Sequence, residues 1–449
     1  MASTYLSRTP SSAGNRRTLT ISAWIKLAGL GTNRHIICEE GAGTEKIDEI
    51  KISNTDVLRI ENYNDSGSDY SLITSQVFRD PNAWYHLVVA FDSTQATSSD
   101  RIKVYLNGSQ ITSFSTETYP SQNHDFYWNS NLEKVGIGAD TRTPSNYFNG
   151  SMAHVHFIDG TAYDASAFGE TDATTGIWKP KTAPSVTYGT NGFFLKFENS
   201  GSMGTDSSGN GNNFTVNGTL TQTVDTPSNV FATWNPLSQY QTVTVSNGNT
   251  SALVAAADPK PNISGTLYPT TGKWYWEGKA SNSGVSNWLF GIRPEGMHYN
   301  QTNIFILSGT YSGIYYYGDN GQKYVNGSAS SYGNSYTTND IISVALDLDN
   351  GYIYFAKNGT WQNSGDPTSG ATGTGGISIT NLGLPYTASL TSGASSQAAG
   401  MDINFGNGYF GTSQVASAGT SSSGDNAIWE YDCPTGYYSL CTKNINTYG

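Results

Sequence analysis

Alternation of apolar and polar residues with a period of two recurs along the chain, and helical periodicity of any length is missing. Residues 101–106 place their aliphatic side chains on one face and then meet Asn107-Gly108, which favours the positive φ of a type I′ turn. This segment therefore predicts a β-hairpin. The same pair returns at Asn149-Gly150, Asn217-Gly218, Asn247-Gly248, Asn326-Gly327, Asn350-Gly351, Asn358-Gly359 and Asn407-Gly408. Turns spread over the whole length predict an all-β fold of two antiparallel β-sandwiches.

A polar segment at residues 220–229 carries one proline and separates two regions that each begin and end with strand-like runs. It predicts a short, taut linker, because it is not a Gly/Ser tract. The sequence therefore predicts one domain at residues 1–222 and another at residues 228–449. Residues 364–376 and 392–400 are poor in apolar side chains and are expected to be long surface loops.

The composition narrows the class of function. The 449 residues include 29 Tyr, 17 Phe and 10 Trp, but only 13% are charged, which excludes long charged helices and coiled coils. The formal net charge of −12 would repel nucleic acid and anionic membranes. No apolar run is long enough for a signal peptide or a membrane span, so we expect no Sec export and no membrane insertion.

Three cysteines, Cys38, Cys433 and Cys441, are an odd number in a long chain. A reducing cytosol would leave them as free thiols, and a Cys433–Cys441 clasp across a hairpin is the alternative.

Four segments follow one another in the first half, at residues 20–25 (TISAWI), 84–92 (WYHLVVAFD), 102–108 (IKVYLNG) and 148–155 (FNGSMAHV). In that order and at those spacings they resemble the laminin-G-like, concanavalin A-like jelly roll. Residues 206–212 (DSSGNGN) match a tag common in that family. The tag follows the main strands here, whereas many relatives have it before them. This departure implies a rearranged strand order, with residues 193–197 returning to the same sandwich.

The second half contains residues 272–277 (GKWYWE), 288–292 (WLFGI) and 341–359, where an Asp-Asn-Gly turn is followed, after one strand, by a second Asn-Gly. These segments resemble the SPRY/B30.2 sandwich. A laminin-G-like domain followed by a SPRY domain resembles structural proteins of marine tailed bacteriophages of the cyanophage type. This resemblance implies a virion protein, assembled in the host cytoplasm and exposed on the particle as a tail fibre, capsid decoration or adhesin. It also implies other virion proteins as partners and a homo-oligomer, with a trimer expected.

No constellation of residues specifies an enzyme. Concanavalin A-like glucanases need two carboxyl groups about 5–5.5 Å apart, supplied by Glu-x-Asp-x-x-Glu on one strand face. The nearest match begins with Glu170 and Asp172 but has Thr175 in place of the second acid, and Glu45 to Glu49 has the wrong spacing. We therefore expect no catalytic residue.

Two segments have residue types that suit a metal. His154 and His156 lie two apart on an expected strand and share a face that could bind a metal, and a solvated or partner-facing sheet face is the interpretation we favour. The loop at Asp206 and Asn210 is rich in oxygen donors and would hold calcium, or it satisfies its own backbone as an Asx turn. We expect no cofactor, with calcium at this loop as the alternative.

Surface recognition is the remaining function, since sugars stack on aromatic rings while amides and carboxylates bind their hydroxyls. Two aromatic clusters offer this mixture, and in an extended segment at least one ring of each must face away from the core. Packing at a domain or oligomer interface is the alternative. The candidate ligand-binding residues are Tyr127 and Trp128 in the first cluster and Tyr315, Tyr316 and Tyr317, near Tyr311, in the second.

The sequence thus predicts a non-enzymatic virion surface protein that assembles with other subunits and binds host-surface polysaccharide. A polysaccharide-degrading module with unrecognised catalytic residues is the alternative.

Overall fold

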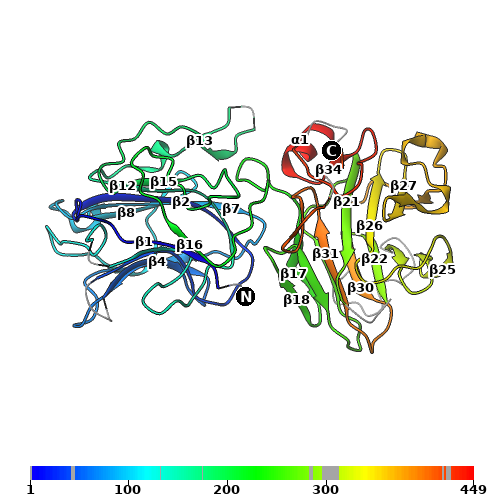
Figure 1. The fold of residues 1–449 in the computed structure, drawn as a ribbon, viewed down its shortest axis with the longest axis horizontal. Helices are drawn as coiled ribbons and strands as arrows, with labels where there is room; N and C mark the ends of the chain where they lie inside the picture. Colours follow the sequence, from blue (N-terminus) through cyan, green and yellow to red (C-terminus); the bar gives the residue numbers. More distant parts are fainter. Residues whose placement is uncertain are drawn as a thin grey trace. The chain divides into compact units, whose positions relative to one another are not determined.

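The computed structural model describes residues 3–41, 46–131, 133–173, 175–282, 287–295, 313–416, 419–420 and 426–449. The chain divides into two compact units, residues 1–222 and 223–449, which are drawn in Figure 1 and described one at a time below. The division falls inside the polar segment at residues 220–229.

The first unit is a sandwich of two antiparallel sheets. One sheet has the order β10(Phe114–Thr118), β6(Ser71–Val77), β5(Val57–Tyr63), β4(Ile47–Ile52), β3(Arg34–Glu40), β11(Val135–Ile137), β1(Tyr5–Arg8), β16(Thr215–Asn217). The other has the order β15(Phe193–Leu195), β12(Gly150–Asp159), β2(Thr18–Leu27), β7(Trp84–Asp92), β8(Ile102–Leu106), β9(Ser109–Ile111). A separate pair is formed by β13(Gly169–Thr171) and β14(Trp178–Pro180), and two 3-10 turns are η1(Ser98–Asp100) and η2(Ala165–Ala167).

Period-two alternation explains how the first unit forms its core. In β2, Leu19, Ile21 and Ile25 point into the sandwich, while Ser22 and Trp24 lie on the opposite face. The β15 strand, within residues 193–197, pairs with β12 and so belongs to this sandwich, as the resemblance implied. The two sheets bury one apolar cluster between them.

The second unit is also a two-sheet sandwich. One sheet has the order β17(Trp234–Tyr240), β20(Asn262–Gly265), β30(Tyr386–Ser392), β22(Trp288–Pro294), β23(Ile314–Tyr317), β24(Gln322–Val325), β25(Ser328–Ser331). The other has the order β18(Val243–Ser246), β19(Ser251–Val254), β31(Ala399–Asn404), β21(Lys273–Ala280), β26(Ile341–Asp347), β27(Tyr352–Lys357), β28(Thr360–Trp361), with β29(Ile377–Ser378) on β27 and β34(Tyr438–Ser439) parallel to β21. The remaining elements are β32(Tyr409–Phe410), β33(Ser413–Gln414), η4(Gln362–Ser364), η5(Pro367–Thr372) and α1(Thr442–Tyr448).

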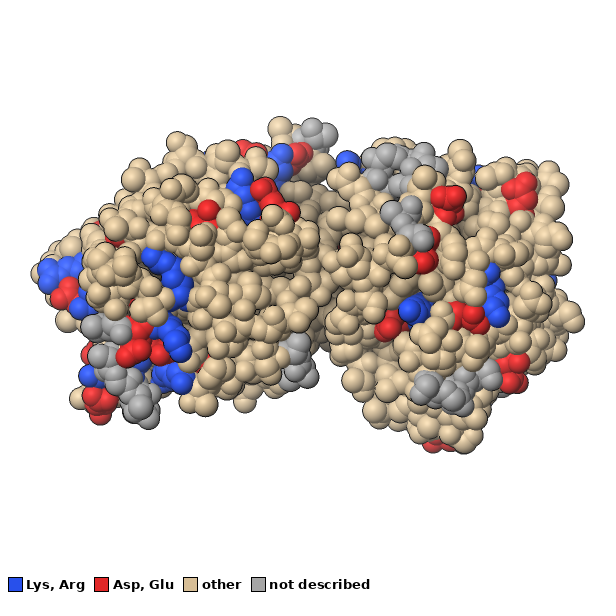
Figure 2. Space-filling model, viewed as in Figure 1, with Lys and Arg blue, Asp and Glu red and all other residues tan. Residues whose placement is uncertain are grey.

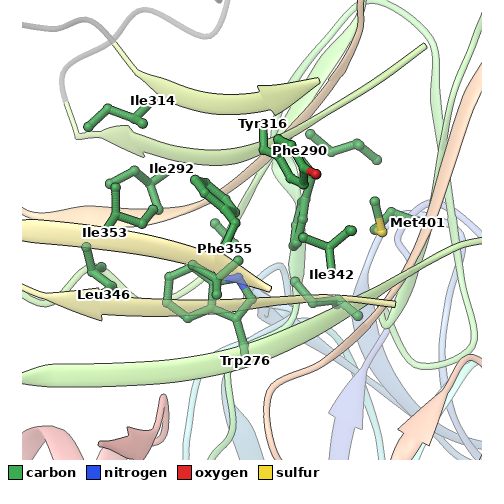
Figure 3. Packing of buried hydrophobic residues seen from close by; sticks show 14 of the residues in the cluster. Trp276, Phe290, Ile292, Ile314, Tyr316, Ile342, Leu346, Ile353, Phe355 and Met401 are labelled. Carbon is green, nitrogen blue, oxygen red and sulfur yellow. The ribbon is translucent and has the colours of Figure 1, made fainter. Parts of the chain in front are cut away.

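Large aromatic side chains fill the core of the second unit. Trp276 of β21 and Phe290 of β22 lie between the sheets among aliphatic residues such as Ile342 and Leu346 (Figure 3). Each is fully buried, so the alternating segments identified in the sequence supply the inner faces of both sheets. The predicted all-β class is confirmed. Among the described residues, no helix has the length and apolarity that crossing a lipid bilayer requires.

The Asn-Gly turns are of two kinds. Both residues have positive φ at Asn107-Gly108, Asn247-Gly248, Asn326-Gly327 and Asn358-Gly359. At three of these pairs a two-residue turn joins neighbouring strands: β8 to β9, β24 to β25 and β27 to β28. In the other four pairs the asparagine lies outside the left-handed region, so the type I′ assignment is wrong there. Those pairs belong to other loop geometries that Asn-Gly also fits.

Candidate functional site

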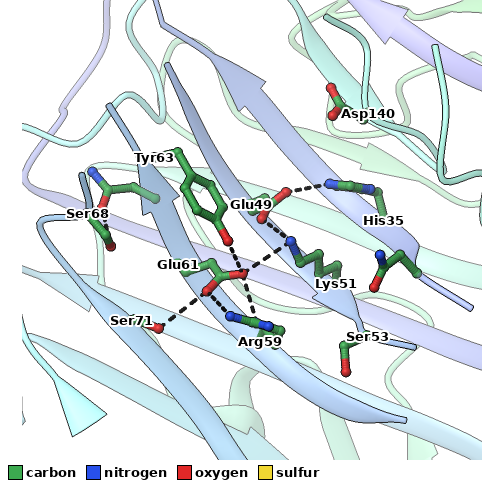
Figure 4. Close-up of polar contacts among 12 residues, drawn as sticks. His35, Glu49, Lys51, Ser53, Arg59, Glu61, Tyr63, Ser68, Ser71 and Asp140 are labelled. Carbon is green, nitrogen blue, oxygen red and sulfur yellow. Dashed lines mark hydrogen bonds and ion pairs between the residues drawn. The ribbon is translucent and has the colours of Figure 1, made fainter. Parts of the chain in front are cut away.

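A cluster of charged side chains lies on the outer face of the eight-stranded sheet of the first unit (Figure 4). In β4, Ile50 and Ile52 enter the core, so Glu49 and Lys51 point outward. The same alternation turns three residues of β5 to this side. We call the cluster the charged face, and its members are His35, Glu49, Lys51, Arg59, Glu61, Tyr63 and Ser71.

Two carboxylates on neighbouring strands organise the charged face. Glu49 and Glu61 are directly opposite in the β4–β5 pairing, and Lys51 contacts both of them, with its Nζ 3.2 Å from Glu61 Oε1. His35 Nε2 lies 2.5 Å from Glu49 Oε2, and Arg59 Nε lies 2.9 Å from Glu61 Oε1. Each carboxylate is therefore held by two nitrogen-bearing side chains.

The ring of Tyr63 is part of the same network. Its hydroxyl donates a hydrogen bond to Glu61 Oε1 at 3.2 Å, and Ser71 Oγ donates to Glu61 Oε2 at 3.3 Å. Lys51 Nζ lies 5.5 Å from the centroid of the Tyr63 ring, within the range of a cation–π contact. The ring is thus fixed at its hydroxyl end and on one face.

The carboxylate of Glu49 and the amine of Lys51 both keep their charges at neutral pH. Burial by itself would raise the pKa of Glu49, but the hydrogen bonds and positive charges of His35 and Lys51 outweigh it and lower that pKa to about 2. Burial opposes the charge of Lys51, yet the nearby carboxylates of Glu49 and Glu61 raise its pKa above the usual value. Neither group changes its charge near neutrality.

The carboxylates lie beneath the side chains that they hold. Side-chain exposure is 1% for Glu49 and 3% for Glu61, against 13% for Lys51 and 31% for Arg59. Tyr63 is 39% exposed. Solvent therefore meets an aromatic ring and hydrogen-bond donors in fixed positions, which suits a hydroxylated ligand. Glu61 accepts bonds from Lys51, Arg59, Tyr63 and Ser71, so it has no free oxygen for acid or nucleophilic catalysis.

The first predicted aromatic cluster does not form such a surface. Trp128 is fully buried because the loop that carries it is drawn into the sandwich by two inward-pointing acids. Asp48 Oδ2 accepts from the backbone N–H of Trp128 at 2.9 Å, and Glu39 accepts from those of Asn129 and Ser130 at 2.6 and 2.8 Å. The prediction of Trp128 as an exposed binding residue is therefore wrong. Its neighbour Tyr127 is half-buried.

The second predicted cluster is corrected in the same way. Tyr316 lies in the core beside Phe355 (Figure 3), and Tyr315 is buried on the opposite side of the sheet, with its hydroxyl 3.1 Å from Ser389 Oγ. Both are fully buried because β23 is an internal strand of its sheet and has packed side chains on both faces. Tyr317 stays half-buried, and Tyr311 lies outside the described residues.

The charged face escaped the sequence analysis, although a signal for it exists. Residues 47–52 (IDEIKI) and 58–61 (LRIE) alternate isoleucine or leucine with charged side chains, which predicts a strand pair with a charged outer face. Glu49 and Glu61 lie on different strands, so spacing along one strand does not bring them together. Register can be read only once the strand order is known.

A family model of known proteins matches a segment of each unit. The family model of the concanavalin A-like lectin/glucanases superfamily matches residues 2–167, and the SPRY domain model matches residues 273–377. The chain has a concanavalin A-like domain followed by a SPRY domain. No curated protein matches the chain.

The solved structures that match include SPRY domains. The SPRY domain of human HERC1 is 18% identical, with 38% of this chain and 96% of that chain covered and a TM-score of 0.30. A human SPRY domain is 15% identical, with 36% and 93% covered and a TM-score of 0.27. The PSpry domain of TRIM65 is 16% identical, with 38% and 91% covered and a TM-score of 0.29.

A serine–histidine pair in the concanavalin A-like domain resembles part of a hydrolase site, but the histidine nitrogen that faces the serine carries a proton and so does not accept one from it. Ser22 Oγ lies 2.9 Å from His86 Nε2, and Trp178 Nε1 donates to His86 Nδ1 at 2.9 Å. Because Nδ1 is an acceptor, the proton of the neutral ring is on Nε2, which donates to Ser22. Burial lowers the pKa of His86 to about 3, so the ring stays neutral and does not act as the base for Ser22.

The neighbouring histidines lie on the same outer face of the second sheet of that domain. His154 has a φ of +47° at a β-bulge in β12, and His156 is buried against Phe194 with 3.9 Å between ring centroids. His156 Nδ1 also lies 3.0 Å from the Tyr188 hydroxyl. His298 is outside the described residues, and within the described ranges no three His, Cys, Asp or Glu side chains are grouped to hold a metal ion.

The Asp206 loop satisfies its own backbone. Asp206 Oδ1 accepts from the N–H groups of Phe194 and Ser208, and Oδ2 accepts from Ser208 Oγ and Asn212 N, at 2.8 to 2.9 Å. Asn210 donates its amide to the carbonyl oxygens of residues 189 and 192. These donors occupy the carboxylate that calcium would need, so the Asx-turn interpretation fits and the calcium interpretation does not.

The remaining candidates are accounted for by local contacts. Asp172 forms an ion pair with Lys179 at 2.8 Å in the β13–β14 hairpin, and Glu170 lies 3.8 Å from the same amine. In the SPRY domain, Cys433 and Cys441 are buried and form no disulfide, so the alternative of a clasp between them is wrong. Glu45 is outside the described residues.

Proposed function

We propose that this chain is a non-enzymatic bacteriophage virion surface protein, a fibre, decoration or adhesin component, and that it binds host-surface glycan through the charged face. Concanavalin A-like and SPRY domains are folds that bind proteins or carbohydrates, which supports the general part of this proposal. The order of the two domains resembles that of tailed-phage structural proteins, and this supports the virion part.

The observation that carries the glycan proposal is the position of Tyr63. Its ring is exposed beside Lys51 and Arg59, and both cations are tied to buried carboxylates. Donors held in this way lose little conformational entropy when a ligand binds. A sugar can stack on the ring while these donors bind its hydroxyl groups.

We further propose that this chain forms a homotrimer and that its SPRY domain mediates assembly with other virion proteins. Much of the surface seen in Figure 2 is uncharged. The exposed apolar side chains Leu237, Leu253 and Leu382 of this domain suit contact with another subunit. Immunogold labelling of particles and native mass spectrometry of the purified chain test these two statements.

Glycan-array binding of Tyr63→Ala tests the glycan proposal. We expect the variant to lose about tenfold in affinity for host polysaccharide, because an aromatic anchor is removed. The matched control is Tyr448→Ala, which removes a similarly exposed ring from the C-terminal helix of the other domain and should bind normally.

The outcome separates three functions. Loss of binding in Tyr63→Ala alone supports a glycan-binding face. Release of reducing sugar from the polysaccharide by the wild-type chain would instead support the degrading module. No binding to any glycan by the wild-type chain would leave an assembly role alone.

A further inference from the structure

A row of polar side chains covers the outer face of the seven-stranded sheet of the SPRY domain. It includes Asn262 and Ser264 of β20, Ser389 of β30 and Arg293 of β22, all fully buried or nearly so. Ser238 of β17 lies at the end of the row and is half-buried. Arg293 is the only arginine in residues 223–449.

Arg293 is a buried cation whose partners are all neutral. Its side chain is 2% exposed, and Nη1 donates to Asn262 Oδ1 at 2.9 Å. Nη2 donates to Ser238 Oγ at 2.6 Å and to Ser264 Oγ at 2.8 Å, and it is 3.4 Å from the Ser238 carbonyl oxygen. Among the described residues, no carboxylate lies within ion-pair distance of it.

The other fully buried arginine of the chain shows the contrast. Arg34 in the concanavalin A-like domain has its Nη2 2.7 Å from Asp56 Oδ1, so its charge is neutralised by a carboxylate. Burying a charge without a counter-charge costs several kcal/mol. Arg293 therefore leaves an uncompensated positive charge beneath the surface of the SPRY domain.

Two buried polar groups at this point have no hydrogen-bond partner among the described residues: the side-chain amide nitrogen of Asn262 and the hydroxyl of Thr387, which lies opposite Arg293 in the β22–β30 pairing. Asn262 Oδ1 accepts from Arg293, and this contact fixes the orientation of the amide. Asn262 Nδ2 is then a buried donor that has no acceptor among the described residues. An unpartnered buried donor next to a cation that has no counter-charge favours an acceptor that is negatively charged.

We propose that Arg293 and Asn262 form a buried site for a small monovalent anion of halide size. One positive charge balances a monovalent ion, whereas phosphate or sulfate would bring an excess negative charge into a buried position. Asn262, Ser264 and Ser389 are fully buried, so an ion bound here is enclosed by protein. The site lies in the SPRY domain and does not depend on the proposed glycan function.

Thermal unfolding of the full chain in chloride and in gluconate, at equal ionic strength, tests the proposal. Chloride fits the site and gluconate does not. We expect the melting temperature of the SPRY transition to be about 3–6 °C higher when chloride is in roughly tenfold excess over its dissociation constant. Equal melting temperatures in the two salts would overturn the proposal and leave Arg293 as a purely structural link between strands.

Asn262→Asp provides the decisive variant, because it places a carboxylate where Arg293 can pair with it. The variant should melt higher than the wild type in gluconate and should lose its dependence on chloride. The matched control is Asn320→Asp, an exposed turn residue whose side-chain oxygen caps Gln322 N, and it should keep the wild-type dependence. A chloride effect that persists in Asn262→Asp would place the ion elsewhere and refute the site.

Bromide soaked into crystals of the full chain gives a second readout that does not depend on stability. An anomalous peak within contact distance of Arg293 and Asn262 is expected. Anomalous peaks only at exposed positions would count against the site.

Discussion

Single buried acids decide where the loops of the concanavalin A-like domain go. Glu39 and Asp48 face each other on β3 and β4 and point into the sandwich, where their oxygens accept backbone N–H groups of residues 128–130. Hydrogen bonds to charged or polar acceptors in a buried site are strong, so these two side chains fix the loop and bury Trp128 with it. The same two acids also make the stability of this domain depend on pH.

The stability of the concanavalin A-like domain should fall as the pH rises from 6.5 to 8. Burial raises the pKa of Glu39 to about 8 and that of Asp48 to about 7, against the N–H donors that lower both. The folded state then holds protons that the unfolded chain has released, so raising the pH favours unfolding. Burial lowers the pKa of His86 to about 3 and that of His154 to about 4, which has the opposite effect only below about pH 6.5.

Urea unfolding of residues 1–222 measures this effect. We expect the free energy of unfolding to be about 1–2 kcal/mol smaller at pH 8 than at pH 6.5. Glu39→Gln should flatten the slope, while Glu170→Gln, a half-exposed acid, should leave it unchanged. A wild-type domain of equal stability at both values would contradict the raised pKa of the buried acids.

At the scale of elements, hairpin turns set which strands become neighbours, and side chains adjust each turn. The loop from β26 to β27 contains Asn350-Gly351 but is capped by Asp347, whose oxygens accept from the backbone N–H and the side-chain amide of Asn350. Asn350 is thereby kept out of the left-handed region, and Gly351 alone has positive φ, at +78°. A glycine is needed there even though the turn is not type I′.

Gly351→Val should destabilise the SPRY domain by about 1–3 kcal/mol. A Cβ at this position would add steric crowding, since Leu382 Cδ1 would lie 3.0 Å from it. Thermal unfolding measures the change. Gly201→Val is the matched control, because Gly201 lacks a positive φ and its Cβ would meet its nearest neighbour at 3.4 Å. Equal losses in the two variants would show that the backbone at Gly351 is not the cause.

At the scale of the whole molecule, each unit has an aromatic and aliphatic core of its own. Tyr70 and Phe91 belong to the cluster of the concanavalin A-like domain, and Trp274, Trp276 and Trp288 to that of the SPRY domain. A domain with its own hydrophobic core can fold without its neighbour. The two units are therefore expected to be separately stable.

Expression of residues 1–222 and 223–449 as separate chains tests this expectation. Both fragments should show cooperative thermal unfolding and dispersed amide spectra. Cutting inside a sandwich, for example after residue 112, should give insoluble products, because it separates paired strands of one core. Failure of both domain fragments to fold would show that each unit depends on the other.

The sequence by itself determined the class of fold, because alternation and turn signals are local. The β2 and β8 strands, the Asn107-Gly108 hairpin and the core tryptophans of β21 and β22 can all be read from spacing within a few residues. Tertiary structure alone decided exposure and register. The residues next to Trp128 and Tyr316 in the sequence are of the same types as those next to exposed aromatic residues. Only the packing of distant strands buries these two rings. The pairing of Glu49 with Glu61, and the isolation of Arg293 from every described acid, depend on which strands become neighbours, which sequence spacing does not encode.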